Sequence, residues 1–393
     1  MKSVLLRAPL LSQSGYGVHS RQVARWLFDR ADNANKADSL DVTTELLNWG
    51  QTPWYVDAYA QNELIGRCFQ ASSNTKELYD VTIQLQLPNE WCPELGKYNV
   101  GMTAGVEADR CNPAWIDNIN KMNLVIVPSR FTKEVFENSG KITTPIIVVA
   151  ESFFDDIQRY EEIKPLDFQP ETKFNFLVFG QVTGGDASSD RKNLPFTLKW
   201  LCETFADKPD VGIILKTNMG RYTEADKHLC TQSLTQLLQN VNKQASPKFY
   251  LLHGEMSDEE VVGLYKHPTI KALVTLTHGE GFGLPILEAA ACGLPVIASG
   301  WSAHTEFLNL GKYIKIETKL GSVPQPRLDG QIWMQGAQWG VPDEADFKKR
   351  VIRFYEESAI PRQWAKDLKQ KLANSYNFAS ISKSYDAVLA GVL

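Results

Sequence analysis

The chain has 393 residues, 43% of them hydrophobic and 22% charged, and a net charge of −5. A chain of this length is too long for one ordinary hydrophobic core, which predicts two domains. The lack of a basic excess argues against a nucleic-acid or anionic-membrane partner, and the six cysteines, which form no Cys-x-x-Cys pair, argue against a disulfide scaffold or a zinc knuckle.

The N-terminus carries no targeting signal that we recognise. Its segment MKSVLLRAPLL has an apolar run that is too short for a signal peptide and is interrupted by Arg7. Elsewhere no window approaches the roughly 18–20 apolar residues of a membrane span. We therefore expect a cytoplasmic protein without a transmembrane segment.

Apolar runs alternate with amphipathic stretches from the N-terminus onward. Helical patterns occur at 18–28 and 130–140, and the second ends on Gly140 as a C-cap. The runs typical of strands in the first half are 3–9, 41–47, 81–87, 98–103, 124–129 and 145–150. Such alternation predicts a parallel sheet with helices on both faces.

The same alternation starts again in the second half. Its strand-like runs are 174–180, 211–217, 248–254, 270–276, 294–299 and 312–316. The sequence therefore predicts an α/β protein with two Rossmann-like domains, and ligands are expected beyond the carboxyl ends of the strands. The polar stretch 161–173, with Pro165 and Pro170, is the candidate boundary, whereas 317–340 reads as a long loop without an assigned role.

One stretch in the second half, HGEGFGLPILEAAACGLP at 278–295, combines glycines with two acidic residues. It follows a predicted strand, and a helix is expected to begin near Leu284, with Pro285 in its first turn and Gly293 just past its end. The glycines of the loop allow backbone amides to approach a ligand closely. Together with the helix N-terminus, these amides predict a phosphate site.

The two acidic residues have a functional and a plain interpretation. Glu288 lies four residues after Leu284 on the same helix face, where a carboxylate can accept hydrogen bonds from two vicinal ribose hydroxyls. Glu280 lies in the loop, closer to a sugar joined to the phosphate. In the plain interpretation, Glu288 only interacts with the helix dipole and Glu280 is solvated. The surrounding loop favours the functional interpretation.

Glu280 and Glu288 have seven residues between them, which include Gly-Phe-Gly-Leu-Pro, and resemble the E-x7-E motif of family-four retaining glycosyltransferases of the GT-B fold. Arg191, Lys192 and Asn193 resemble that family's Arg-Lys-Gly/Asn element, and Glu306 resembles a later glutamate of the family. The stretch NLVIVPSRFTKEVFENSG is similar to the last strand and helix of its N-terminal domain. The resemblance implies two Rossmann-like domains that face each other across a cleft.

The resemblance also implies roles for individual residues. Lys192 would stabilise the leaving diphosphate, and Arg191 and Glu280 would act with it in catalysis. Where the family has an arginine after the first strand of the C-terminal domain, this chain has Gln181. The residues implied in donor binding are Glu288, Phe282, Gly283, Leu284, Gly281, Gly15 and Gly17.

On the N-terminal side, Gly15 and Gly17 are expected in a loop that enters a helix, and a plain strand-to-helix turn is the alternative for them. Glu107 and Asp109 follow the strand-like run 98–103 and are candidates for the acceptor side. The histidines are expected to be structural or solvated; they include His19, His253, His278 and His304.

The resemblance thus implies a metal-independent hexosyl- or pentosyltransferase that uses a UDP- or GDP-sugar and needs no other cofactor. The expected acceptor is a glycan, a lipid-linked molecule or a small molecule; a modified nucleic acid stays open but is not indicated. The alternatives are a sugar-nucleotide epimerase of the same fold and a catalytically weak nucleotide-sugar binder. The expected domains are 1–165 on the acceptor side and 166–375 on the donor side, with a last helix at 376–393 packing on the first.

Overall fold

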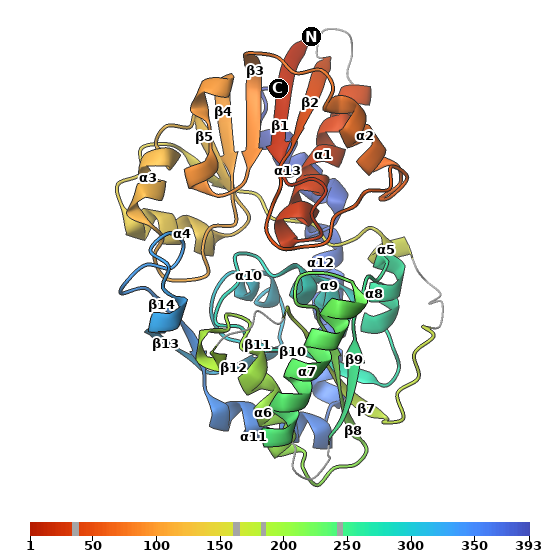
Figure 1. Ribbon diagram of the computed structural model, residues 1–393. Coiled ribbons are helices and arrows are strands. Elements are labelled where there is room, and N and C mark those ends of the chain that lie inside the picture. The colour runs from red at the N-terminus through yellow and green to blue at the C-terminus, as the bar shows by residue number, and fades with distance from the viewer. Residues whose placement is uncertain (34–38, 160–165, 182–185, 242–246) are drawn as a thin grey trace. The chain divides into compact units, whose positions relative to one another are not determined.

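The computed structural model describes residues 1–33, 39–159, 166–181, 186–241 and 247–393 (Figure 1). Contacts divide the chain into unit 1, with residues 1–106, 110–152 and 378–393, and unit 2, with residues 107–109 and 153–377. The division therefore falls at residue 152 rather than at the expected residue 165. Part of the expected boundary, 161–165, lies outside the described residues.

The described part of unit 1 contains a six-stranded parallel sheet with the order β2-β1-β3-β4-β5-β6. Its strands are β1 (Lys2–Ala8), β2 (Leu40–Leu46), β3 (Tyr79–Leu85), β4 (Gly96–Met102), β5 (Leu124–Val127) and β6 (Ile146–Val148). Its helices are α1 (Gly15–Asn33), α2 (Leu64–Ala71), α3 (Pro113–Ile119), α4 (Arg130–Ser139) and α13 (Phe378–Val388). Gly140 takes the C-cap of α4 as predicted, although with an extended φ of 172° rather than a left-handed one.

The core of unit 1 joins the first helix and the last helix of the chain to the sheet. Buried side chains of β1 and β3, such as Leu6 and Ile83, pack with those of α1 and α13. Trp26 of α1 lies 5.1 Å from Tyr385 of α13 between ring centroids, and its Nε1 donates to Asp386 at 3.0 Å. The C-terminal helix is therefore an integral part of unit 1.

Unit 2 contains a second six-stranded parallel sheet among its described residues, with the order β12-β11-β10-β7-β8-β9. Its strands are β7 (Phe174–Phe179), β8 (Val211–Lys216), β9 (Lys248–Leu252), β10 (Ile270–Thr275), β11 (Val296–Ser299) and β12 (Ile314–Ile316). The predicted strands of both halves are present, with bounds shifted by at most two residues. The expected α/β fold with two parallel-sheet units is confirmed.

Helices cover both faces of the sheet in unit 2. One face buries Phe176 and Val178 of β7 against Leu198 and Val351, whereas Leu177 points to the opposite face. The helices are α5 (Asp156–Arg159), α6 (Leu194–Thr204), α7 (Glu224–Val241), α8 (Asp258–Tyr265), α9 (Leu284–Cys292), α10 (His304–Leu308), α11 (Glu344–Glu356) and α12 (Ala359–Ser375). None of the helices in the described part of the chain combines the length and the apolar character needed to cross a bilayer.

The prediction of a long loop at 317–340 is wrong at both ends of this segment, whereas residues 323–337, all of them described, form no strand. β13 (Thr318–Ser322) and β14 (Gln338–Pro342) form an antiparallel pair there, and a short 3-10 helix η4 (Gln325–Arg327) lies in the segment that connects them. Local sequence patterns hardly indicate this pair, because TKLGS and QWGVP lack the alternation of apolar and polar residues that marks a half-buried strand.

Candidate active site

The strand order of unit 2 places its crevice between β7 and β10. These two strands pair in parallel although they are separated by β8 and β9 along the chain. In open parallel sheets, the connections on the two sides of such a switch point diverge, and a ligand crevice opens beyond the carboxyl ends of the strands. A ligand site of unit 2 is therefore expected among the residues that follow β7 and β10.

The segment after β7 is held in place by hydrogen bonds at the start of α6. Asp190 accepts from the backbone amides of Lys192 at 3.2 Å and Leu194 at 2.8 Å. Asn193 adopts a left-handed φ of 54°, and its Nδ2 donates to the Leu276 carbonyl at 3.0 Å. These bonds fix Arg191 and Lys192 beside the segment that follows β10.

The segment after β10 binds back to the first one. The His278 amide donates to the Arg191 carbonyl at 2.9 Å, and the Arg191 guanidinium donates to the Gly279 carbonyl at 3.0 Å. A Cβ at Gly279 would lie 2.7 Å from the Glu107 carbonyl oxygen, so this close approach requires glycine. The two motifs, 88 residues apart in sequence, form one site.

Two cations and two carboxylates meet at this site. Lys192 Nζ donates to Glu280 Oε1 at 2.7 Å and Oε2 at 2.9 Å. One Arg191 terminal nitrogen lies 3.5 Å from Glu280 Oε2 and 3.2 Å from Glu107 Oε1. The structure thus brings together the three residues predicted to act in catalysis and adds Glu107 to them. Their formal charges cancel in the ligand-free protein.

Glu280 stays ionised in this cluster. Burial alone would raise the pKa of its carboxyl group, but the charges of Lys192 and Arg191 outweigh burial and lower that pKa to about 2. Its backbone amide donates to Ser302 Oγ at 2.9 Å, which fixes the loop. At neutral pH the Glu280 carboxylate therefore accepts hydrogen bonds, as a sugar hydroxyl would require, and does not act as a proton donor.

Three consecutive amides, those of residues 282–284, lie at the N-terminus of helix α9. Gly283 has a left-handed φ of 100° and forms the N-cap, and the side chains of Phe282 and Leu284 are buried. Among the described residues, the amides of Phe282, Gly283 and Leu284 have no hydrogen-bond partner. Because buried amides are rarely left unpaired, these groups at a helix N-terminus suit an anionic ligand.

Glu288 lies one turn into α9 and is 5% exposed. Its Oε2 accepts a hydrogen bond from Tyr265 at 3.1 Å, and burial followed by the charge of Glu288 raises the pKa of the Tyr265 hydroxyl. Tyr265 was not predicted as a site residue, since nothing in the spacing of α8 marks it as a partner. The predicted ribose contact of Glu288 stays a prediction, as do the donor roles of the loop residues.

Glu107 and Asp109, the acceptor-side candidates, were expected in the N-terminal unit. Residues 107–109 instead group with unit 2. Asp109 and Gln338 bind each other through two hydrogen bonds, from the Asp109 amide at 2.8 Å and from the Gln338 amide at 2.6 Å. The contacts of Glu107 with Arg191 and of Asp109 with β14 therefore place these residues in unit 2, although the chain on both sides of them belongs to unit 1.

Gly15 and Gly17 lie in the first turn of α1 in unit 1, not in a loop ahead of it. A Cβ at Gly17 would lie 1.8 Å from the Ser12 carbonyl oxygen, whereas a Cβ at Gly15 would meet nothing within 4 Å. Close packing against Ser12 thus explains why position 17 is a glycine. The donor role of both glycines stays a prediction.

Two of the histidines have structural surroundings. His278 stacks on Trp339 with 4.2 Å between ring centroids and an angle of 7°, and its Nδ1 lies 2.6 Å from the Gly340 carbonyl oxygen.

His253 Nε2 lies 2.7 Å from Asp226 Oδ2, and Cys230 completes a group of three possible metal ligands within 4.8 Å of one another. Asp226 also accepts from the amides of Met219 and Arg221, so it orders the segment after β8. The prediction of a metal-independent reaction stays a prediction.

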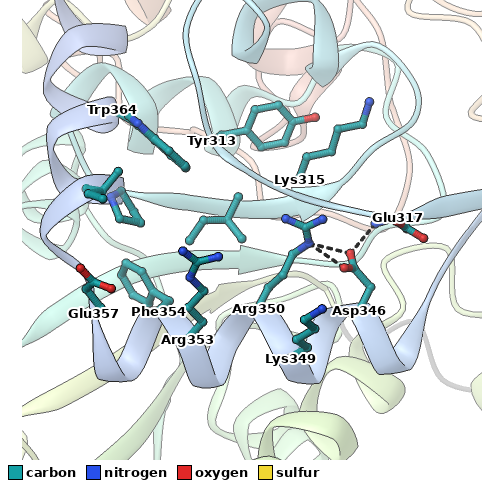
Figure 2. Close-up of a pocket in the computed structure, with 13 residues that line it drawn as sticks. Tyr313, Lys315, Glu317, Asp346, Lys349, Arg350, Arg353, Phe354, Glu357 and Trp364 are labelled. Atoms are coloured by element: carbon teal, nitrogen blue, oxygen red, sulfur yellow. Dashed lines mark hydrogen bonds and ion pairs between the residues drawn. The ribbon is translucent and has the colours of Figure 1, made fainter.

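A separate groove of about 490 Å³ lies between β12, α11 and α12 (Figure 2). Arg350 projects into it and donates through Nε to Asp346 at 2.8 and 2.7 Å, and Trp364 lines its other side. The lining residues come from the edge strand β12 and from α11 and α12, whereas Lys192 and Glu280 follow the central strands β7 and β10. The groove is therefore not part of the candidate active site.

Comparisons with known proteins agree with this geometry. Residues 233–318, which include the segment after β10 and helix α9, match the family model of glycosyl transferases group 1. This match covers less than half of the chain and is confined to unit 2. The chain is 32% identical over 127 residues to a probable sucrose-phosphate synthase of Thermosipho melanesiensis, a match that covers 31% of this chain and 27% of that protein.

Solved structures of glycosyltransferases share the fold over the whole chain. The sucrose-phosphate synthase of Thermosynechococcus elongatus has a TM-score of 0.64 at 13% identity, with 100% of this chain and 99% of that chain covered. HepE of Anabaena, in complex with UDP and glucose, has a TM-score of 0.60 at 13% identity, and both chains are covered completely, at 100%. These likenesses show that the chain has the GT-B fold of these structures.

Proposed function

We propose that the protein is a retaining glycosyltransferase that moves a hexose or pentose from a UDP- or GDP-sugar to a hydroxyl acceptor. The observation that carries this proposal is the contact of Lys192, Arg191 and Glu280 at the switch point of unit 2. The group 1 family match of residues 233–318 supports it, as does the fold shared with HepE, whose structure was solved in complex with UDP and glucose.

In the proposed donor complex, the diphosphate binds between Lys192 and the amides of Phe282, Gly283 and Leu284. The diphosphate competes with Glu280 for Lys192, since Lys192 Nζ already donates to both Glu280 oxygens. Glu280 then accepts from hydroxyls of the transferred sugar. Glu288 accepts from the ribose hydroxyls, one turn further into α9.

The proposed reaction is a same-face substitution at the anomeric carbon. The bond between this carbon and the diphosphate oxygen breaks, a bond to the acceptor oxygen forms on the same face, and the acceptor proton passes to the departing phosphate oxygen. Lys192, Arg191 and the helix N-terminus stabilise the charge that develops on the diphosphate. This route needs no metal ion and no protein base.

A nucleotide screen with wild type and Glu288→Ala tests the donor site. At about 100 times its dissociation constant, a nucleotide adds about 2.7 kcal/mol to the free energy of unfolding, so a clear rise in melting temperature is expected for UDP or GDP over ADP. Glu288→Ala should reduce that rise. If no nucleotide stabilises wild type, the donor site is wrong.

The reaction itself separates the alternatives. NMR of an incubation with the sugar nucleotide and a mixture of hydroxyl acceptors should reveal a product with the anomeric configuration of the donor. Inversion would contradict the retaining mechanism. An altered sugar nucleotide without any acceptor product would indicate an epimerase, and nucleotide binding without any reaction would indicate a weak binder.

A further inference from the structure

The segment between β13 and β14 holds an arginine at the edge of the candidate active site. The ends of the segment are tied by the Val323 amide, which donates to the Ala337 carbonyl at 2.9 Å. Asp329 Oδ1 accepts from three successive amides, those of Gln331, Ile332 and Trp333, at 2.9, 2.8 and 2.9 Å. The segment therefore has a defined conformation that fixes Arg327 at the end of η4.

A series of ring contacts connects Arg327 to the active-site loop. The guanidinium carbon of Arg327 lies 4.9 Å from the ring centroid of Trp333, which is 2% exposed. Trp333 makes an edge contact with Trp339 at 5.6 Å, and Trp339 stacks on His278 at 4.2 Å. His278 is two residues before Glu280, so this series of contacts leads from Arg327 to the loop that holds Glu280.

The Arg327 guanidinium lacks an ion-pair partner among the described residues, and its Nε is buried without a hydrogen bond. Burial lowers the pKa of Arg327, the charge of Arg191 lowers it further, and Glu107 opposes both. The group nevertheless stays protonated, because arginine does not deprotonate in proteins. A buried unpaired donor on a charged group is costly, which points to a missing anion.

The acidic residues that act on Arg327 are already engaged. Glu107 lies 3.2 Å from Arg191, and Asp190 accepts from the amides of Lys192 and Leu194. Asp329 accepts from three amides of its own turn. None of these three carboxylates forms a hydrogen bond or an ion pair with Arg327 in the described part of the chain, so the cation is available to a ligand.

The ring contacts place Arg327 on the side of the candidate active site that Trp339 and His278 form. The charges of Arg191 and Glu107 both act on its guanidinium. We propose that Arg327 forms a subsite for an anionic group, phosphate or carboxylate, on the acceptor substrate. This inference rests on the proposed transferase function and narrows its acceptor to anionic molecules.

Calorimetric titration with inorganic phosphate, on protein saturated with UDP, tests the subsite. The variants are Arg327→Gln and Arg327→Lys, with Arg353→Gln as a matched control, because Arg353 is an exposed arginine of unit 2 whose side chain makes no hydrogen bond or ion pair with the described residues. We expect Arg327→Gln to weaken phosphate binding about tenfold or more, as for the loss of a charge-assisted hydrogen bond, and Arg327→Lys to retain part of the affinity. Arg353→Gln should bind phosphate like wild type.

Two further readouts separate a binding role from a structural one. The affinity for UDP should be unchanged in Arg327→Gln, and its melting temperature should not fall, since a buried unpaired donor is removed. Competition experiments distinguish a phosphate from a carboxylate on the acceptor. Glucose 6-phosphate and glucuronate are each tested for displacement of bound phosphate, with glucose as the neutral reference.

Unchanged phosphate affinity in Arg327→Gln would overturn the proposal. A loss of UDP affinity instead would mean that Arg327 binds the donor diphosphate, which would also overturn it. If wild type fails to bind UDP, the proposed function fails, whereas titration of nucleotide-free protein with phosphate still tests the anion site. The failures of the two proposals are thus distinguishable.

Discussion

Each unit of the protein buries a glutamate just beyond its sheet, and the two carboxyl groups have opposite pKa shifts. Glu151 follows β6 in unit 1, and burial raises the pKa of its carboxyl group to about 8. Glu280 follows β10 in unit 2, and its pKa falls to about 2 although burial acts on it in the same sense as on Glu151. Burial therefore decides the protonation of Glu151, whereas neighbouring cations overcome burial at Glu280.

The partners of the two carboxylates explain the difference. Glu151 Oε1 lies 3.9 Å from His19 Nδ1, its Oε2 has no hydrogen bond among the described residues, and burial lowers the pKa of His19 to about 4. Both groups are thus neutral at pH 7. Glu280 has Lys192 at 2.7 Å and Arg191 at 3.5 Å. The pair of His19 and Glu151 in unit 1 is therefore uncharged. The cluster of Lys192, Arg191 and Glu280 in unit 2 keeps charges that a ligand can use.

The largest expected effect is on the ion pair of unit 2. Lys192→Met leaves Glu280 buried with Arg191 alone, which should lower the free energy of unfolding by about 3 kcal/mol, the lower end of the cost of breaking a buried pair. Urea unfolding at pH 7 measures this change. Adding Glu280→Gln should return most of the loss, and Lys199→Met is the control, because Lys199 is a partly exposed lysine of α6. A Lys192→Met variant as stable as wild type would contradict the electrostatic account.

The next effect concerns unit 1 and depends on pH. The pKa of Glu151 is raised in the folded state, so its contribution to stability is present below about pH 4.5 and is lost as the pH rises to about 8. Glu151→Gln should therefore match wild type at pH 4 and exceed its free energy of unfolding by about 4 kcal/mol at pH 8. Thermal unfolding across this range, with Glu137→Gln as an exposed control, measures it. A constant difference at all pH values would show that Glu151 does not titrate in the folded protein.

The smallest expected effect is on nucleotide affinity. Glu280→Gln releases Lys192 from its carboxylate, so UDP should bind about fivefold tighter, a gain of roughly 1 kcal/mol. Sugar transfer should be slower at the same time, because the sugar loses a carboxylate acceptor. Calorimetry with UDP and initial rates with the sugar nucleotide measure the two quantities. Weaker UDP binding would place Glu280 in direct support of the nucleotide instead.

Local patterns were sufficient to predict the strands and the segment around α9. Apolar runs bounded by turn residues marked both sheets, and Pro285 and Gly293 marked the start and end of α9, where Gly293 has the left-handed φ of 82° expected of a C-cap. Glu280 was predicted from its loop and from the family resemblance, whereas Lys192 was predicted from the resemblance.

The contacts between distant segments could not be predicted. The pairing of Lys192 with Glu280 depends on β7 and β10 being neighbours, which the strand order decides and the sequence pattern does not. The grouping of Glu107 with unit 2 depends on its contact with Arg191, and Arg327 lies in a segment without periodic apolar residues. Non-local packing, rather than local propensity, decides these features.

The central claim is that Lys192, although paired with Glu280 in the free protein, binds the donor diphosphate. Calorimetric titration with UDP tests it on wild type, Lys192→Ala and Lys199→Ala, the last being the same substitution at a partly exposed position of α6. The account predicts that Lys192→Ala binds UDP about 30-fold more weakly, as for the loss of a charge-assisted hydrogen bond, while Lys199→Ala binds like wild type. Equal affinity of Lys192→Ala and wild type would contradict the account.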